Sequence, residues 1–97
     1  MIVRTSTAYI RPGREAEFRA VIVAMVAEFP RRYPGLHSHE VLVGLDGSTL
    51  VYLSRWVDEA ALIGFAGAGW RDLPVTFPGE AEYLTRPLEL RHYTIVA

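Results

Sequence analysis

Three side chains that could bind an aromatic molecule alternate along one segment of the sequence. Tyr52, Ser54 and Trp56 are two residues apart, so on a β-strand they lie on one face. Trp56 would offer an aromatic wall with an N–H donor, and Tyr52 would offer a hydroxyl that can bind an oxyanion. The same pattern is typical of half-buried aromatic side chains that stabilise a sheet, so both interpretations stay open.

The histidines are a second candidate for chemistry. His37 and His39 are two residues apart on a predicted strand, so we expect them to point the same way, and His92 lies near the end of the chain. Neutral imidazole is a common metal ligand and a natural base near pH 7. We expect no metal site, because the neighbouring acid, Glu40, alternates to the opposite face. A base role for one histidine stays open.

Three arginines fall on predicted strands, at Arg4, Arg55 and Arg91. An arginine on a covered sheet face needs a carboxylate or an anionic ligand, because its charge is not lost at any ordinary pH. An ion pair across a dimer with Glu40 or Glu89 is the simpler expectation.

The composition excludes several classes of function. Ten basic and eleven acidic residues give a net charge of −1, so the chain lacks the basic field that nucleic acid or an anionic membrane attracts. It has no cysteine, which excludes disulfides, zinc–thiolate sites and cysteine nucleophiles. It also has no lysine, asparagine or glutamine, which excludes lysine Schiff bases and carboxamide oxyanion donors.

No segment predicts a membrane span or a leader. No apolar run approaches the roughly 20 residues that cross a bilayer. The first five residues lack the charged and then apolar layout of a signal peptide. We therefore expect a cytoplasmic protein with one domain, residues 1–97.

Apolar periodicity predicts the elements that must position these side chains. Alternation and β-branched residues predict four strands, over residues 2–10, 36–45, 48–57 and 88–96. Helical spacing of apolar residues predicts helices over residues 14–29 and 59–66. Pro30 is expected to end or kink the first helix at Phe29, and Asp58 is a good N-cap for the second.

The segment from residue 70 to residue 87 is long for a connection in a small domain. It contains Pro74, Pro78 and Pro87, with a possible helical turn from Glu80 to Leu84. Such segments are often lids or binding loops.

The order of elements, β-α-β-β-α-β, predicts a ferredoxin-like α+β fold. One four-stranded antiparallel sheet would carry both helices on one face. The strands are apolar on both sides, so we expect the second face to pack on another copy of the chain.

Three short motifs carry a resemblance to a known family. Arg11-Pro12-Gly13 ends the first strand, Tyr33-Pro34-Gly35-Leu36 opens the second, and residues 52–56 precede an acid-rich helix start. Together they resemble the antibiotic biosynthesis monooxygenase family of dimeric α+β barrels, over about residues 1–66. Members of that family include oxygenases that turn phenolic polyketides into quinones without metal or flavin. Others degrade haem or act on autoinducer and quinol substrates.

The resemblance is partial at the level of single residues. Quinone-forming members have a tryptophan where this chain has Trp56, an asparagine at Tyr52 and a tyrosine at Leu62. Only the tryptophan is kept. The functional residues of haem-degrading members correspond to Ser6, Phe65 and Val75. None matches, so haem degradation is not expected.

The resemblance implies an oxidoreductase: a homodimeric, cofactor-independent monooxygenase acting with O₂ on a small aromatic or polyketide-type phenol. Trp56 and Tyr52 would be its catalytic residues. Four residues would bind the substrate around them: Ser6, Ser54, Phe65 and Trp70. An isomerase or cyclase with a histidine base stays open, as does a non-catalytic dimer that binds a small molecule.

Overall fold

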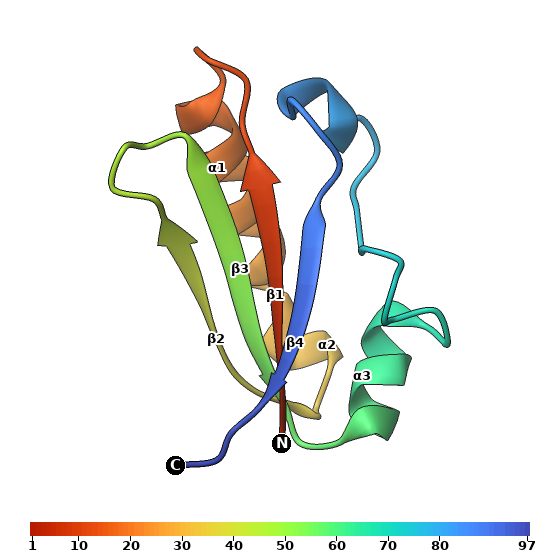
Figure 1. Ribbon diagram of the computed structural model, residues 1–97. Coiled ribbons are helices and arrows are strands. Elements are labelled where there is room, and N and C mark those ends of the chain that lie inside the picture. Colours follow the sequence, from red (N-terminus) through yellow and green to blue (C-terminus); the bar gives the residue numbers. More distant parts are fainter.

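The four predicted strands form one antiparallel sheet (Figure 1). The computed structural model describes residues 1–97, and its strands are β1 (Ile2–Tyr9), β2 (Leu36–Val43), β3 (Thr49–Trp56) and β4 (Glu89–Thr94). The strand order is β2-β3-β1-β4, so β3 and β1 are central and β2 and β4 form the two edges. This order confirms the predicted ferredoxin-like α+β fold.

The helices lie on one face of the sheet, as predicted. They are α1 (Glu15–Val26), α2 (Phe29–Arg32), α3 (Glu59–Ala66) and a short 3₁₀-helix, η1 (Glu80–Tyr83). The prediction that one helix runs to Phe29 was wrong, because α1 ends at Val26 and Phe29 begins α2. A proline has no N–H to continue a helix but suits the first turn of a new one, which is where Pro30 stands.

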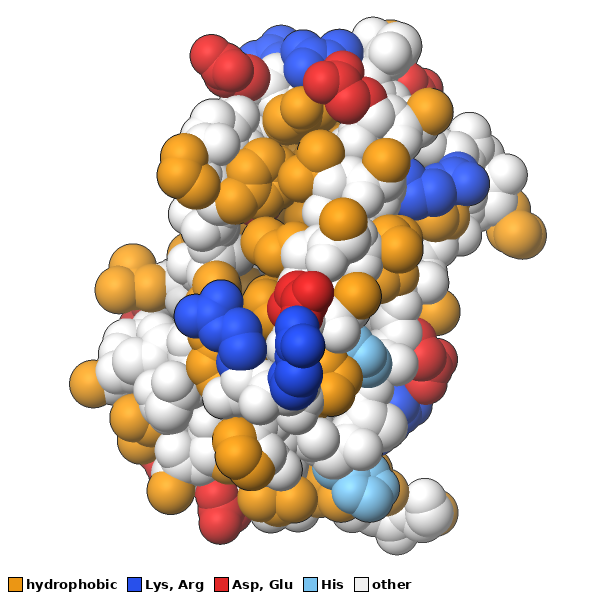
Figure 2. Space-filling view, turned by 180° about the vertical axis from the view of Figure 1, so that it is seen from behind, with side chains coloured by type: hydrophobic (Ala, Val, Ile, Leu, Met, Phe, Trp, Pro, Cys, Tyr) orange, Lys and Arg blue, Asp and Glu red, His pale blue; other side chains and the backbone are white.

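The core lies between the sheet and these helices. From α1, the buried side chains Phe18, Ile22 and Val26 pack toward the sheet at helical spacing. From α3, the fully buried Leu62 also belongs to this core. Figure 2 views the molecule from this side and shows hydrophobic side chains spread across it, with charged groups at the top and in the lower middle of the view. No helix is long and apolar enough to cross a membrane.

Strand register brings polar residues together on the helix-covered face. Ser6 of β1 lies opposite Tyr52 of β3, and Arg4 lies opposite both Ser54 of β3 and His92 of β4. Because side chains alternate along a strand, these groups share one face with the buried Ala8 and Leu50.

The opposite face of the sheet has no helix over it (Figure 1). It carries a mixture of apolar and polar side chains: Val3, Thr5, Thr7, Leu42, Val51, Leu53, Arg55 and Tyr93. Leu42 is 41% exposed and Tyr93 is 52% exposed. We call this surface the open sheet face.

The turn before β2 approaches α3 closely. A side-chain carbon built on Gly35 would stand 2.2 Å from the Cβ of Ala61, so only glycine fits there. The Pro34-Gly35 pair therefore does more than stop the preceding helix, because it lets the turn pack directly on α3.

Candidate functional site

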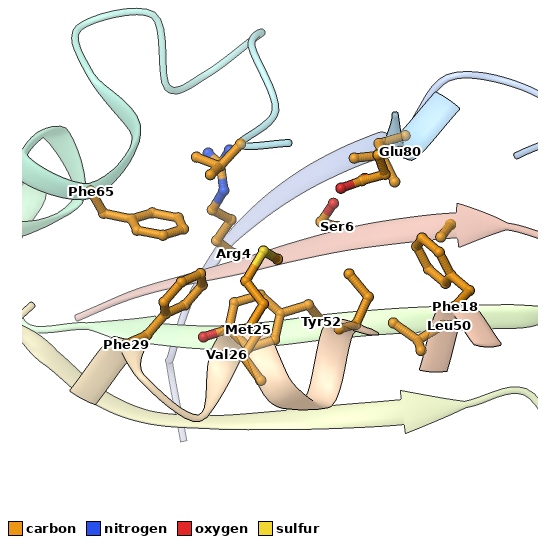
Figure 3. Close-up of a pocket in the computed structure, with 14 residues that line it drawn as sticks. Arg4, Ser6, Phe18, Met25, Val26, Phe29, Leu50, Tyr52, Phe65 and Glu80 are labelled. Carbon is orange, nitrogen blue, oxygen red and sulfur yellow. The ribbon is translucent and has the colours of Figure 1, made fainter. Parts of the chain in front are cut away.

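A cavity of about 40 Å³ lies between the sheet and the helices (Figure 3). It is lined by side chains from β1, α1, α2, β3, α3 and the segment that leads to β4: Arg4, Ser6, Ala8, Phe18, Ile22, Met25, Val26, Phe29, Leu50, Tyr52, Phe65, Val75, Glu80 and Leu88. Eleven of these 14 residues are hydrophobic, so the cavity offers an apolar, aromatic environment with a few polar groups. One lining residue, Met25, has an unbranched and adaptable side chain.

An aromatic cluster forms one end of the cavity: Phe29, Tyr33, Tyr52, Trp56 and Phe65. The ring of Phe65 stacks on Trp56 with centroids 4.8 Å apart and meets Phe29 edge-on at 5.3 Å. Phe29 also meets Tyr52 edge-on, at 5.9 Å. Edge-to-face and stacked pairs stabilise such a group beyond simple area burial. The cluster therefore holds Phe29 and Phe65 in fixed orientations against the cavity.

A second group of rings lies at the other end of the cavity. Phe18 of α1 lies 6.2 Å from Phe77 and 5.5 Å from Tyr83, measured between ring centroids. Tyr83 is held in place because its hydroxyl donates to Glu17 at 2.9 Å. Of these three rings only Phe18 lines the cavity, so an aromatic side chain bounds the cavity at this end as well.

Tyr52 presents its ring to the cavity and its hydroxyl to a histidine. The hydroxyl lies 2.8 Å from Nδ1 of His39 on the neighbouring strand β2. Burial raises the pKa of Tyr52 well above its usual value of about 10, so the hydroxyl stays protonated at neutral pH. When Nδ1 of His39 carries the proton of this contact, the Tyr52 hydroxyl keeps its own proton to donate to a ligand at the edge of the site.

Trp56 lies behind the cavity wall. The side chain is 0% exposed, and its Nε1–H donates to Oγ of Ser54 at 2.9 Å. Neither residue lines the cavity. Trp56 contacts the site through Phe65, on which it stacks.

Arg4 ties the sheet to the segment that follows α3. It is 3% exposed, and its guanidinium donates to the backbone carbonyls of Trp70 at 2.6 Å and Leu73 at 3.2 Å. It also contacts Nε2 of His92 at 3.1 Å. Since a guanidinium only donates, Nε2 accepts and the ring is neutral. Burial, with the charges of Arg4 and Arg71, lowers the pKa of His92, which agrees with this protonation state.

Two of the three arginines pair with the expected carboxylates, and Arg4 does not. Arg55 pairs with Glu40 at 2.8 Å and Arg91 with Glu89 at 3.5 Å, both within one chain. Arg4 has no carboxylate partner, because three neutral acceptors surround its guanidinium instead.

Glu80 is a buried carboxyl group that the sequence did not single out. It is 4% exposed and begins η1, where one oxygen, Oε1, accepts the backbone N–H of Phe77 at 3.2 Å. Burial raises the pKa of Glu80, and the Phe77 N–H opposes this only in part. The sequence signal was weak, since one acid after Pro78-Gly79 resembles any helical turn start.

The predicted site residues divide into two groups. Tyr52, Ser6 and Phe65 line the cavity, as do Arg4 and Glu80. Ser54, Trp56 and Trp70 are buried but do not line it. For these three, direct contact with a substrate stays a prediction.

The histidines do not gather. His92 lies on β4 and His39 on β2, at opposite edges of the sheet, as expected. A strand irregularity between Leu36 and Ser38 interrupts simple alternation, so His37 is exposed while His39 reaches Tyr52. No group of three His, Cys, Asp or Glu side chains is placed to hold a metal ion.

Comparison with known proteins places this chain in a family. A family model described as antibiotic biosynthesis monooxygenase matches residues 1–68, from the start of the chain to just beyond α3. The chain belongs to the antibiotic biosynthesis monooxygenase family. The predicted resemblance is therefore confirmed, and it rests on the part of this family member that forms β1, α1, β2, β3 and α3. No curated protein matches the chain.

Solved structures share the fold of this family member over its whole length. Rv0793 from Mycobacterium tuberculosis is 23% identical, with 99% of this chain and 95% of that chain covered and a TM-score of 0.75. A protein from Nitrosomonas europaea that carries the family name is 18% identical, with both chains fully covered and a TM-score of 0.77. PA3566 from Pseudomonas aeruginosa is 19% identical over 99% and 94% of the chains, with a TM-score of 0.75. At these identities the likeness shows the fold alone.

Proposed function

We propose that this protein is an oxygenase that oxidises a small phenolic aromatic substrate with O₂ in the cavity between the sheet and the helices. The observation that carries the proposal is the lining of that cavity, which is apolar, aromatic at both ends and supplied with a few hydrogen-bonding groups. Membership of the antibiotic biosynthesis monooxygenase family supports the reaction class.

The proposed chemistry needs an electron-rich substrate that loses a proton and then gives an electron to O₂. Loss of the proton leaves an aryl oxide, and one electron passes from it to O₂. The resulting radicals combine, and loss of water gives a carbonyl group. For an anthrone-type substrate, the methylene group and O₂ become a carbonyl group and water, so no bound cofactor takes part in the proposed reaction.

Three residues have proposed roles in holding the substrate. The Tyr52 ring would pack on the substrate, and its hydroxyl, backed by His39, would bind the aryl oxide. Phe65 would form the facing wall. Trp56 would position Phe65 by stacking on it, which gives the retained tryptophan an indirect role.

Oxygen uptake tests this proposal. Purified, chelator-treated protein is given anthrones and naphthols, and both O₂ consumption and quinone formation are followed. We expect uptake that resists the chelator and falls at least about tenfold in Tyr52→Phe, because one oxyanion donor is lost. Trp56→Phe should lower uptake less, since a ring still packs on Phe65.

Tyr9→Phe is the matched control. Tyr9 lies on the open sheet face, where its hydroxyl contacts Glu89 at 3.4 Å, so uptake should be unchanged. Equal losses in Tyr9→Phe and Tyr52→Phe would contradict a site at this cavity. Uptake that disappears with the chelator would contradict a cofactor-independent reaction.

The two alternative functions predict different observations. A histidine base would have to reach the cavity, and no histidine lines it. A non-catalytic binding protein would hold a naphthol without consuming O₂. Fluorescence titration beside the uptake assay separates that case from the proposed oxygenase.

We also propose that the protein is a homodimer joined through the open sheet face. This face leaves Leu42, Val51, Leu53 and Tyr93 without cover in the single chain. Exposed apolar surface of this kind commonly marks an interface, and isologous dimers are the commonest assemblies.

A further inference from the structure

Glu80 is the one acidic side chain that lines the cavity, and the proposed chemistry assigns it no part so far. The reaction begins with removal of a proton, which requires a group that can accept it within reach of the substrate. Neither His39 nor His92 lines the cavity, and Tyr52 stays protonated. Of the groups that face the ligand space, the Glu80 carboxylate is therefore the available proton acceptor.

One oxygen of Glu80 is committed and the other is free. Oε1 accepts the N–H of Phe77, which fixes the direction of the side chain. Oε2 makes no hydrogen bond. Every side-chain nitrogen or oxygen that is fully enclosed in the protein has a hydrogen-bond partner, so Oε2 is not fully enclosed. Oε2 must therefore be open to the adjoining space. Figure 3 shows the carboxyl of Glu80 and the hydroxyl of Ser6 pointing toward one another across this end of the cavity.

Glu80 also separates the cavity from an outer groove of about 420 Å³. The groove runs along the segment before η1 and the start of β4, and Glu80 and Leu88 line both spaces. A base must release its proton after each turnover. A carboxyl group at the wall between an apolar cavity and an open groove can take a proton on one side and lose it to water on the other.

We propose that Glu80 is the base that removes the proton from the substrate in this cavity, an inference that rests on the proposed function. In an anthrone-type substrate the C–H bond of the methylene group breaks. Its electron pair moves through the ring to the carbonyl oxygen, and the proton goes to Oε2 of Glu80. Ser6, beside this end of the cavity, would hydrogen bond to the substrate.

The surroundings of Glu80 favour this role. Its raised pKa follows from burial, and no charged neighbour contributes to the shift. The other titratable groups that line the cavity or the groove are Arg4 and Tyr52. A base with a pKa raised toward the working pH keeps a larger driving force for accepting a proton than an ordinary glutamate does.

Hydrogen exchange without oxygen tests the proton transfer separately from the oxidation. Anthrone is incubated with the protein in D₂O under nitrogen, and loss of its methylene proton signal is followed by NMR. The wild-type protein should speed the exchange above the buffer rate. Glu80→Gln should lower the enzyme-dependent rate at least about 100-fold, because an amide cannot accept the proton, while its carbonyl can still accept the Phe77 N–H.

The pH profile gives a second readout. A carboxylate base is active only when deprotonated, so the wild-type exchange rate should rise with pH through the raised pKa of Glu80 and then level off. Glu82→Gln is the matched control, since Glu82 also lies on η1 but is exposed and lines neither space. It should leave the rate and the profile unchanged.

The outcomes distinguish this inference from the proposed function. Exchange that depends on Glu80 without O₂ uptake would support the base and contradict the oxygenase. Uptake and exchange that both survive Glu80→Gln would overturn the base and leave the oxygenase standing. If Glu80→Gln fails to fold, Glu80→Asp decides. Its carboxyl group is one methylene further from the substrate, so exchange should be slower, while the rate should still rise with pH and then level off. An exchange rate equal to that of the wild type would overturn the assignment.

Discussion

At the scale of single residues, polar groups on the helix-covered sheet face serve two different purposes. Arg4 joins β1 to the segment after α3, since its guanidinium bonds to the carbonyls of Trp70 and Leu73. Glu80 keeps one oxygen free beside the cavity. A buried group whose hydrogen bonds are all made within the protein stabilises the fold. One with an open bonding position is suited to a ligand.

Arg4→Met should destabilise the protein. The variant keeps an apolar stem but leaves the Trp70 and Leu73 carbonyls without their donor, and a buried unsatisfied group costs about 1–3 kcal/mol. We expect a loss of about 2–4 kcal/mol in the free energy of unfolding, measured by urea denaturation. Arg91→Met, on an exposed side chain, should change it by less than about 0.5 kcal/mol. Equal losses in the two variants would contradict the role of Arg4 in joining β1 to the segment after α3.

The same variant has a pH signature at His92. In the folded protein, burial and the charges of Arg4 and Arg71 lower the pKa of His92. His92 therefore stabilises the fold above its unfolded pKa of about 6.5, and this stability is lost as the pH falls through the lower pKa of the folded state. Without Arg4 the folded pKa should rise toward 6.5, and this loss should shrink. NMR titration of His92 in both proteins measures the shift directly.

At the scale of elements, α3 is short and depends on how it begins. Asp58 stands before it in an extended conformation, and its carboxylate accepts the Ala61 N–H at 2.8 Å. A side-chain cap satisfies a donor that the first turn of a helix otherwise leaves unpaired. Because Phe65 and Leu62 project from this helix, the cap also helps to hold one wall of the cavity.

Asp58→Ala should weaken the protein by about 1 kcal/mol, the usual cost of removing an N-cap side chain. Thermal unfolding measures the change. Asp72→Ala is the control, because Asp72 is an exposed acid in the segment after α3. The melting temperature of this variant should match that of the wild type. A ligand that binds beside Phe65 should restore part of the stability lost in Asp58→Ala.

At the scale of the whole molecule, the sheet separates two surfaces with different roles. One face builds the core and the cavity beneath the helices, and the open sheet face is the proposed dimer interface. Stable interfaces bury about 800 Å² on each partner. A four-stranded sheet with apolar side chains in its centre can supply such an area if two copies pack face to face.

Leu53→Asp should convert the proposed dimer into a monomer. Leu53 lies on the central strand β3, on the open sheet face, where a buried carboxylate would go without a partner. Light scattering at micromolar concentration should give half the wild-type mass. Leu73→Asp places the same charge on a side chain that is 63% exposed away from this face, and should leave the mass unchanged. A monomeric wild-type protein would contradict the proposed assembly.

The sequence alone determined the fold and much of the cavity wall. Strand alternation and helical spacing report burial directly, because a side chain that must leave water recurs at the period of its element. They predicted all four strands, the bounds of α3, the Asp58 cap and the shared face of Tyr52, Ser54 and Trp56. The short motifs added the family, which the family model then confirmed.

Only the tertiary structure decided how those residues are used. Trp56 and Tyr52 share a strand face, yet one is closed behind Phe65 and bonded to Ser54, while the other reaches the cavity and His39. Periodicity gives the face of a strand but not the helix or segment that covers each point along it. Glu80 is the clearest case. The segment around η1 packs against α1, where Phe18 meets Phe77 and Tyr83, and no local pattern encodes this contact between segments far apart in the chain.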